Sequence, residues 1–160
     1  NLRIIRIDYG LWIIASDKKS LCLDYALRIL NQSPVLLQLA APYDILGDSF
    51  TSSQTESFLY ALAHKLPRIK ELDIREEPTF RVREVLPKIG LELLRVCLSH
   101  PQLANLHCNF RIMNFSTEDL HQTNAFLNSV ADDKKAKEAT GKSALGSTIK
   151  SLRLPGIAEG

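Results

Sequence analysis

The sequence has few of the features that mark a membrane protein or a nucleic-acid-binding protein. Its formal net charge over 160 residues is only +2, too small to favour a polyanionic partner or an acidic membrane surface. It has no apolar run that approaches the roughly 18 residues from which a transmembrane helix is inferred. We therefore expect neither nucleic acid nor a membrane among its partners.

Cysteine is also scarce, and the chain has only three, Cys22, Cys97 and Cys108. Their separation matches no metal-ligand motif. The first residues do not read as a secretory signal, because Arg3 and Arg6 interrupt the first apolar run. These features predict buried free thiols rather than disulfides, and an intracellular location in the cytoplasm or the nucleus.

Motifs of catalysis and cofactor binding are missing as well. The tripeptide Gly141-Lys142-Ser143 resembles the end of a phosphate-binding loop, but Ala136 stands where that loop requires glycine. No pair of the four histidines has the spacing of a zinc-binding helix, and no G-x-S-x-G turn occurs. We expect no catalytic residue, no cofactor and no metal. An enzyme or a nucleotide-binding domain is the alternative from a different class.

What the sequence does contain is a short pattern of apolar residues spaced by three and then by two. It is clearest within 66–74, at Ile69, Leu72 and Ile74. A helix would favour spacings of three and four, and a plain strand spacings of two. The five copies of the pattern are Leu2, Ile5 and Ile7; Leu36, Leu39 and Ala41; Ile69, Leu72 and Ile74; Leu103, Leu106 and Cys108; and Ile149, Leu152 and Leu154.

The copies recur at nearly equal intervals. They begin at residues 2, 36, 69, 103 and 149, so the intervals are 34, 33, 34 and 46 residues. The last interval holds an additional polar stretch, at about 132–148, that includes the charged run 132–138. We expect this stretch to form an inserted loop or a helical excursion.

Prolines and helix-like segments alternate with the copies. Pro34, Pro67 and Pro101 each stand two residues before a copy, where proline ends a helix and favours extended backbone. The helix-like segments that precede them are 21–30, 58–66 and 91–98. One unit is therefore a short strand, a loop and a helix, and such a crossover is what a following parallel strand requires.

Some helix ends can also be placed. Residues 53–56 fit a capping box, and Ser116, followed by two acidic residues in the first turn, is a second candidate cap. His64 and His100 are expected near helix ends, where an imidazole can bond the last carbonyl groups.

Stacking of such units would bury a strand face and a helix face that no single unit can bury alone. A period near 34 residues also suits tetratricopeptide repeats, which are helical pairs. The prolines before each copy and the isoleucines within the copies favour a strand at those positions. We therefore predict an α/β fold in a single domain over residues 1–160.

With the five copies in view, the segments 1–7, 66–74 and 148–154 resemble leucine-rich repeats, whose pattern is L-x-x-L-x-L. They are most similar to the long, irregular repeats of fungal F-box/leucine-rich-repeat proteins, and 91–103 has the same character. The resemblance implies a solenoid of the ribonuclease-inhibitor type, a horseshoe fragment of about five repeats. A parallel sheet would line its concave face and helices its convex face.

The sequence departs from that family at one recurring place. The asparagine that follows the family's strand, and forms a buried hydrogen-bonded ladder, is missing here. The residues at those places are Gly10, Asp44, Glu77, Arg111 and Ile157. The turns after the strands must therefore be held in another way.

The resemblance also implies a function, non-catalytic protein–protein recognition. The chain would be the target-recognition part of an F-box adaptor of an SCF-type ubiquitin ligase. The F-box of such a protein would lie before Asn1, so we expect this chain to be a fragment that reaches the ligase core through a segment outside it. A leucine-rich-repeat scaffold or inhibitor unrelated to ubiquitination is the alternative within the same class.

The alternation of side chains along a strand separates packing residues from surface residues. If the apolar triplets face inward, the second, fourth and sixth residues after each first apolar residue face outward in three rows. These rows are mostly polar and carry both signs of charge. The candidate partner-binding residues are Arg6, Asp8, Gln38, Glu71, Asp73, Arg75, Asn105, His107, Asn109 and Arg153.

Overall fold

The computed structural model describes residues 2–7, 19–42, 52–75, 87–109, 111–112, 116–141, 149–153 and 156–157. Five strands form one parallel sheet in the order β1-β2-β3-β4-β6. They are β1 (Ile4–Arg6), β2 (Gln38–Pro42), β3 (Glu71–Arg75), β4 (Asn105–Asn109) and β6 (Ser151–Arg153). The described helices are α2 (Lys19–Asn31), α3 (Ser52–His64), α4 (Pro87–Ser99) and α5 (Thr117–Thr140).

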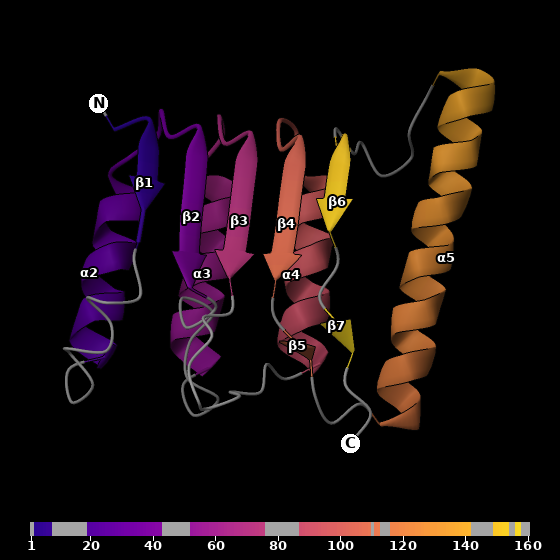
Figure 1. Cartoon of the computed structure of the whole chain (residues 1–160), viewed down its shortest axis with the longest axis horizontal. Helices are drawn as coiled ribbons and strands as arrows, with labels where there is room; N and C mark the ends of the chain where they lie inside the picture. Colours follow the sequence, from indigo (N-terminus) through magenta and orange to yellow (C-terminus); the bar gives the residue numbers. More distant parts are fainter. Residues whose placement is uncertain are drawn as a thin grey trace.

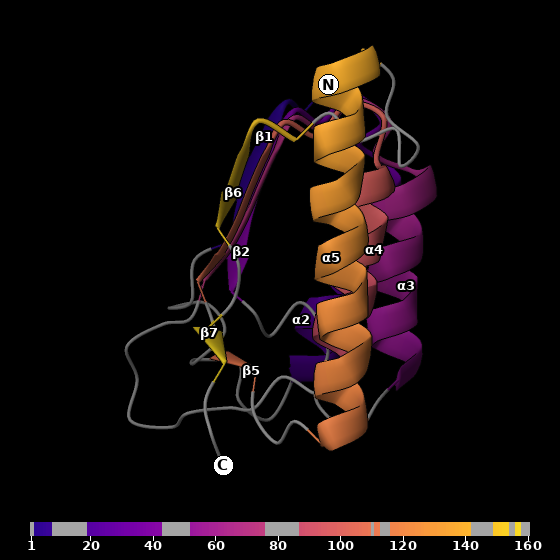
Figure 2. The same ribbon diagram turned by 90° about the vertical axis from the view of Figure 1, so that its right-hand side faces the viewer.

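The molecule has two layers. The strands stand side by side in sequence order (Figure 1), and the helices lie together on one face of the sheet (Figure 2). Among the described residues, a helix lies between each strand of the sheet and the next along the chain, because a parallel neighbour can be reached only through a crossover. The prediction of an α/β fold with a parallel sheet is confirmed.

Pro34 and Pro67 lie at the second position of tight turns that connect helix to strand, and Pro101 follows His100, whose Nδ1 accepts from the Leu103 N–H over 3.1 Å. The N–H of Leu36 donates to the carbonyl of Ser33 over 3.0 Å. In the next unit, the N–H of Ile69 donates to the carbonyl of Leu66 over 3.4 Å. Proline suits this position because its fixed φ matches that of the turn.

In the five-stranded sheet, the start of each strand after β1 is fixed by the same pair of hydrogen bonds. Two successive N–H groups donate to one carbonyl of the preceding strand segment, over 2.7 to 3.1 Å. The pairs are Leu37 and Gln38 to Arg3, Lys70 and Glu71 to Leu37, Ala104 and Asn105 to Lys70, and Lys150 and Ser151 to Ala104. This recurrence keeps the strands in one register, so equivalent side chains face the same side throughout the sheet.

The core lies between the sheet and the helices. The inward strand residues of the three middle copies, and the first apolar residue of each, are at most 2% exposed. These residues are Leu36, Leu39, Ala41, Ile69, Leu72, Ile74, Leu103, Leu106 and Cys108. From the helices, Phe58 and Leu93 pack into the same cluster. The inward assignment is confirmed for the middle copies.

The end copies differ from the middle ones. Leu2 is 52% exposed and Leu152 is 38% exposed. Ile5, Ile7 and Ile149 are only partly buried against the core. Each of these strands has a described neighbour on one side only, so the inward pattern is correct but the burial is incomplete.

α5 accounts for the long last interval. It has 24 residues, compared with 13 in each of α2, α3 and α4, and none of its residues is buried. The predicted charged run 132–138 belongs to its last turns, so the helical excursion is the correct alternative for that part. Residues 142–148 of the polar stretch lie outside the described residues.

Both ends of α5 have explicit caps. The hydroxyl of Ser116 accepts from the Asp119 N–H over 3.1 Å, and the Asp119 carboxylate accepts from the Ser116 N–H over 3.0 Å. The Ser116 hydroxyl also donates to the Asp119 carboxylate over 2.6 Å, and this bond, followed by the bond from the Ser116 N–H, lowers the pKa of the Asp119 carboxyl. At the other end, Gly141 adopts a φ of 73°, which glycine tolerates best. The predicted Ser116 cap is confirmed.

The capping box predicted at residues 53–56 is wrong in position. α3 begins at Ser52, so Ser53 lies inside the helix rather than at its start. The Ser53 carbonyl accepts from the Ser57 hydroxyl over 2.7 Å, a bond typical of a helix interior. Residues 53–56 have the residue types of a capping box, but α3 begins one residue before them.

The missing asparagine ladder has a local replacement after β4 and β6. There, β5 (Arg111–Ile112) and β7 (Gly156–Ile157) form a short parallel pair of their own. The equivalent positions Gly10, Asp44 and Glu77 lie outside the described residues.

Candidate functional site

The face of the sheet opposite the helices carries the candidate residues. Strand pairing aligns them in the predicted rows. The first row is Ile4, Gln38, Glu71, Asn105 and Ser151, and the second is Arg6, Ala40, Asp73, His107 and Arg153. The third row contains Pro42, Arg75 and Asn109. Asp8 and Pro155 lie outside the described residues.

Exposure varies along these rows. Arg6, Gln38 and Arg153 are exposed, and the central side chains of β3 and β4 are half-buried between their neighbours. Pro42 is buried, so the third row is interrupted at β2. The most continuous polar surface therefore runs across the first two rows, with Glu71 and Asp73 near its middle.

An ion pair fixes the charge at the centre of this face. The Asp73 carboxylate accepts from Arg75 through Nε over 2.7 Å, and Arg75 Nη2 lies 2.6 Å from the same oxygen. The Asp73 side chain is 19% exposed and that of Arg75 is 49% exposed. Because the pair is partly screened by solvent, it contributes little to stability, but it orients two opposite charges on this face.

His107 lies opposite Asp73 in the strand register, but its described hydrogen bond goes elsewhere. Its Nε2 lies 3.3 Å from the hydroxyl of Ser151 on the next strand. Among the described residues, the Asp73 carboxylate is bonded to Arg75 and not to His107. Asp73, His107 and Ser151 as described therefore do not include the carboxylate–imidazole bond that orients the histidine of a catalytic triad.

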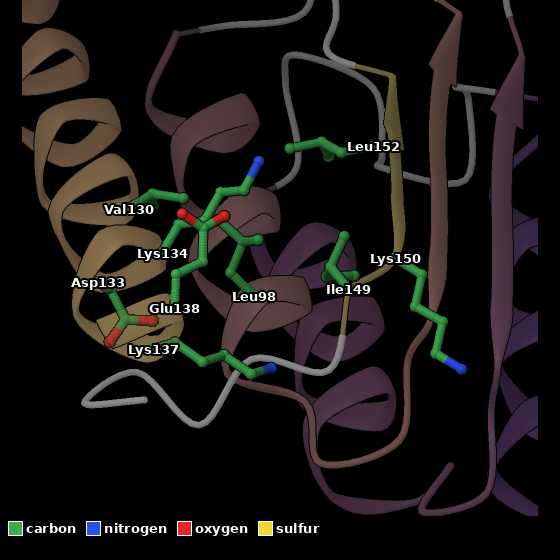
Figure 3. Close-up of a pocket in the computed structure, with 9 residues that line it drawn as sticks. All are labelled: Leu98, Val130, Asp133, Lys134, Lys137, Glu138, Ile149, Lys150 and Leu152. Carbon is green, nitrogen blue, oxygen red and sulfur yellow. The ribbon is translucent and has the colours of Figure 1, made fainter. Parts of the chain in front are cut away.

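A cavity of about 440 Å³ lies at the β6 end of the molecule, between α4, α5 and β6 (Figure 3). Its apolar lining is Leu98, Val130, Ile149 and Leu152. Its charged lining is Asp133, Lys134, Lys137, Glu138 and Lys150. Sequence reasoning missed this site, and neither Asp73 nor His107 lines it.

His100 has a structural role that the sequence located only roughly. Its Nδ1 accepts from the N–H groups of Gln102 and Leu103, each over 3.1 Å. The ring must then be neutral with its proton on Nε2, which donates to the Leu66 carbonyl over 2.9 Å. The expectation that His100 bonds its own helix end was wrong, because the carbonyl belongs to the preceding unit. His64 packs instead against Tyr60, with ring centroids 4.7 Å apart.

The bonding of His100 predicts an acid-sensitive fold. Burial lowers the pKa of its imidazole below the usual 6.5, because removal from water disfavours the charged form. The unfolded chain therefore takes up a proton first, and stability should fall as pH drops through 6.5 towards the lower folded-state pKa. Denaturant unfolding above and below pH 6.5 checks this.

Two variants isolate that acid response. His100→Gln should be less stable throughout, by about 1–3 kcal/mol for buried groups left unpaired, and should lose the part of the pH dependence due to His100. His64→Gln is the matched control, since His64 is exposed. An unchanged pH dependence in His100→Gln would contradict the neutral buried imidazole.

The described cysteine side chains are buried and unpaired, as predicted. Cys97 and Cys108 are free thiols in the core. Burial, with a smaller effect from the negative charge of Asp73, raises the pKa of Cys108 to about 12. Burial and then Cys108 raise that of Cys97. Both thiols are protonated near neutral pH and are poor nucleophiles. The Cys22 side chain lies outside the description.

The described part of the chain contains neither a helix that could span a membrane nor a cluster of metal-binding side chains. No described helix is both long enough and apolar enough to cross a membrane. Within the same residues, no three His, Cys, Asp or Glu side chains are grouped so that they could hold a metal ion. Comparisons with protein-family models, with curated proteins and with solved structures give no match.

Proposed function

We propose that the chain is a leucine-rich-repeat solenoid fragment of the ribonuclease-inhibitor type, with about five irregular repeats. Three regularities of the fold support this proposal. The strands follow one another in sequence order, one helix crosses between each pair, and the same hydrogen-bond pair starts each strand after β1. A solenoid, in which each of a series of equivalent units contacts only its neighbours, has these regularities.

The function we propose is non-catalytic protein–protein recognition by the open face of the sheet. One observation carries it: the rows of polar residues lie in register on one face, and the other face is filled by aliphatic core residues. A packed sheet holds the outward side chains rigidly, so a partner would lose little entropy in ordering them. Charges of both signs at Glu71, Asp73 and Arg75 would select a partner with the complementary arrangement.

The family resemblance places this recognition in a particular setting. The chain would bind the target protein of an SCF-type ubiquitin ligase, and an F-box before Asn1 would bind the ligase core. The open face would serve equally well in a scaffold or an inhibitor. The two settings differ in whether the natural full-length protein contacts the ligase core at all.

Co-precipitation with the core adaptor subunit of the ligase tests the setting. The natural full-length protein should retain that adaptor, and the 160-residue chain alone should not, because the contact is assigned to a segment outside it. Failure of the full-length protein to bind would reject the F-box setting and leave the scaffold or inhibitor. Binding by the 160-residue chain alone would contradict the assignment of the contact to an outside segment.

A further inference from the structure

The recurring backbone carbonyl that accepts two N–H groups from the next strand receives no hydrogen bond from a described residue at β6. The carbonyls of Arg3, Leu37, Lys70 and Ala104 each accept two N–H groups from the following strand. The equivalent carbonyl on β6 is that of Lys150, and no described residue donates to it. One more parallel strand placed beside β6 would complete the same arrangement.

The side chains beside this edge leave room for an inward residue of such a strand. Leu152 is 38% exposed, but its register partner Leu106 is fully buried. The cavity between β6 and α5 borders Leu152 and continues to Leu98 and Val130 (Figure 3). An apolar side chain following Leu152 in the inward row would enter it, and burial of that side chain would be favourable.

The charges on β6 indicate what the flanking residues of the added strand must be. Lys150 and Arg153 are both exposed on this edge, and α5 adds two acidic and two basic residues to the cavity wall, Asp133, Lys134, Lys137 and Glu138, so the basic pair decides the sign. Opposite charges directly across a strand pair stabilise it, and like charges destabilise it. Acidic side chains beside Lys150 and Arg153 therefore fit this edge.

The same rule argues against a second copy of this chain as the occupant. If β1 of another copy continued the register beside β6, Arg3 would lie beside Lys150 and Arg6 beside Arg153. Both pairs are like charges on neighbouring strands. The two edges of the sheet thus repel each other, which suits a chain that avoids growing head to tail into filaments.

We propose that the β6 edge binds an extended segment of a partner protein as an added parallel strand. The segment carries an apolar residue that enters the cavity beside Leu152, an acidic residue two positions before it beside Lys150, and an acidic residue directly after it beside Arg153. Main-chain bonds to the Lys150 carbonyl supply the docking, and the cavity and the basic pair supply the selection. This site shares Arg153 with the open face but does not depend on the function proposed for that face.

A fluorescent peptide that contains the order glutamate, serine, leucine, glutamate tests the proposal by anisotropy. It should bind the wild-type chain, and a matched peptide with lysine in place of both glutamates should not. Arg153→Glu should weaken binding of the acidic peptide roughly tenfold, the size expected for reversing a cross-strand charge pair. Arg153→Glu should also gain binding of the lysine peptide, a result that general loss of structure would not produce.

Two controls separate the β6 edge from other surfaces. Arg6→Glu reverses the equivalent charge on the β1 edge, and Asp73→Lys changes the open face, so both should leave binding of the acidic peptide unchanged. Equal loss in Arg6→Glu and Arg153→Glu, or no binding by the wild type, would overturn the proposal. So would self-association of the wild-type chain in sedimentation that the acidic peptide reverses, because a second copy would then occupy the edge.

Discussion

Leu72→Asp is expected to unfold the protein. Leu72 is fully buried in β3, the middle strand of the sheet, with Leu39 and Leu106 beside it in the register. The substitution removes apolar contacts and places a carboxylate without a partner in the core. The expected loss exceeds about 4 kcal/mol, a large part of the roughly 5–15 kcal/mol that stabilises an ordinary domain. Thermal unfolding followed by circular dichroism measures it.

Glu71→Gln is the matched control for that substitution. Glu71 is the preceding residue of the same strand and faces the open side, where it is half-buried. Its replacement by an uncharged residue of the same shape should change stability by no more than about 0.5 kcal/mol. Equal melting temperatures for Leu72→Asp and the wild type would show that the inward and outward assignments are wrong.

Phe58→Ala should produce the second largest loss of stability, about 3–5 kcal/mol. Phe58 is the largest fully buried side chain of the described core, on the face of α3 that packs against the sheet. Its truncation leaves a cavity in a close-packed interior, where neighbours relax only partly. The free energy of unfolding in urea gives the difference.

Tyr60→Ala is the control on the same helix. Tyr60 lies two residues further on and is 57% exposed, so its truncation should cost no more than about 0.5 kcal/mol. Similar losses for the two aromatic residues would mean that α3 is rotated from the orientation described here.

The register of the middle strands could be predicted to the residue. Each inward position there must be apolar to fill the core, and each crossover is nearly the same length, so the pattern determines the pairing. Asp73 does lie opposite His107, and Glu71 opposite Asn105. Whether those outward residues bind a partner stays a prediction, because a solvated face and a binding face use the same residue types.

The ends of the sheet could not be predicted in the same way. The pattern shows that Leu2 and Leu152 point inward, but their burial depends on a neighbour that no local sequence feature specifies. The partial exposure of Leu152 and the cavity beside it arise together, because α5 buries none of its residues. Nothing in the composition of 132–140 reveals how far that helix stands from the sheet.

The role of His100 shows another limit of sequence reasoning. Its place near a helix end follows from the proline after it. Its acceptor, the Leu66 carbonyl, belongs to a turn 34 residues earlier. That contact exists only after two units stack, so it depends on tertiary structure rather than on helix capping.

The central claim is that the inward rows hold the fold and the outward rows recognise a protein. The most direct test compares target binding by the wild-type chain and by a triple variant, Glu71→Lys, Asp73→Lys and Arg75→Glu. A control triple variant, Asp24→Lys, Glu56→Lys and Lys65→Glu, makes the same charge changes on the exposed helix side. We expect the first variant to lose target binding at an unchanged melting temperature, and the second to bind normally. Normal binding by the first variant, or loss of binding only in the second, would contradict the claim.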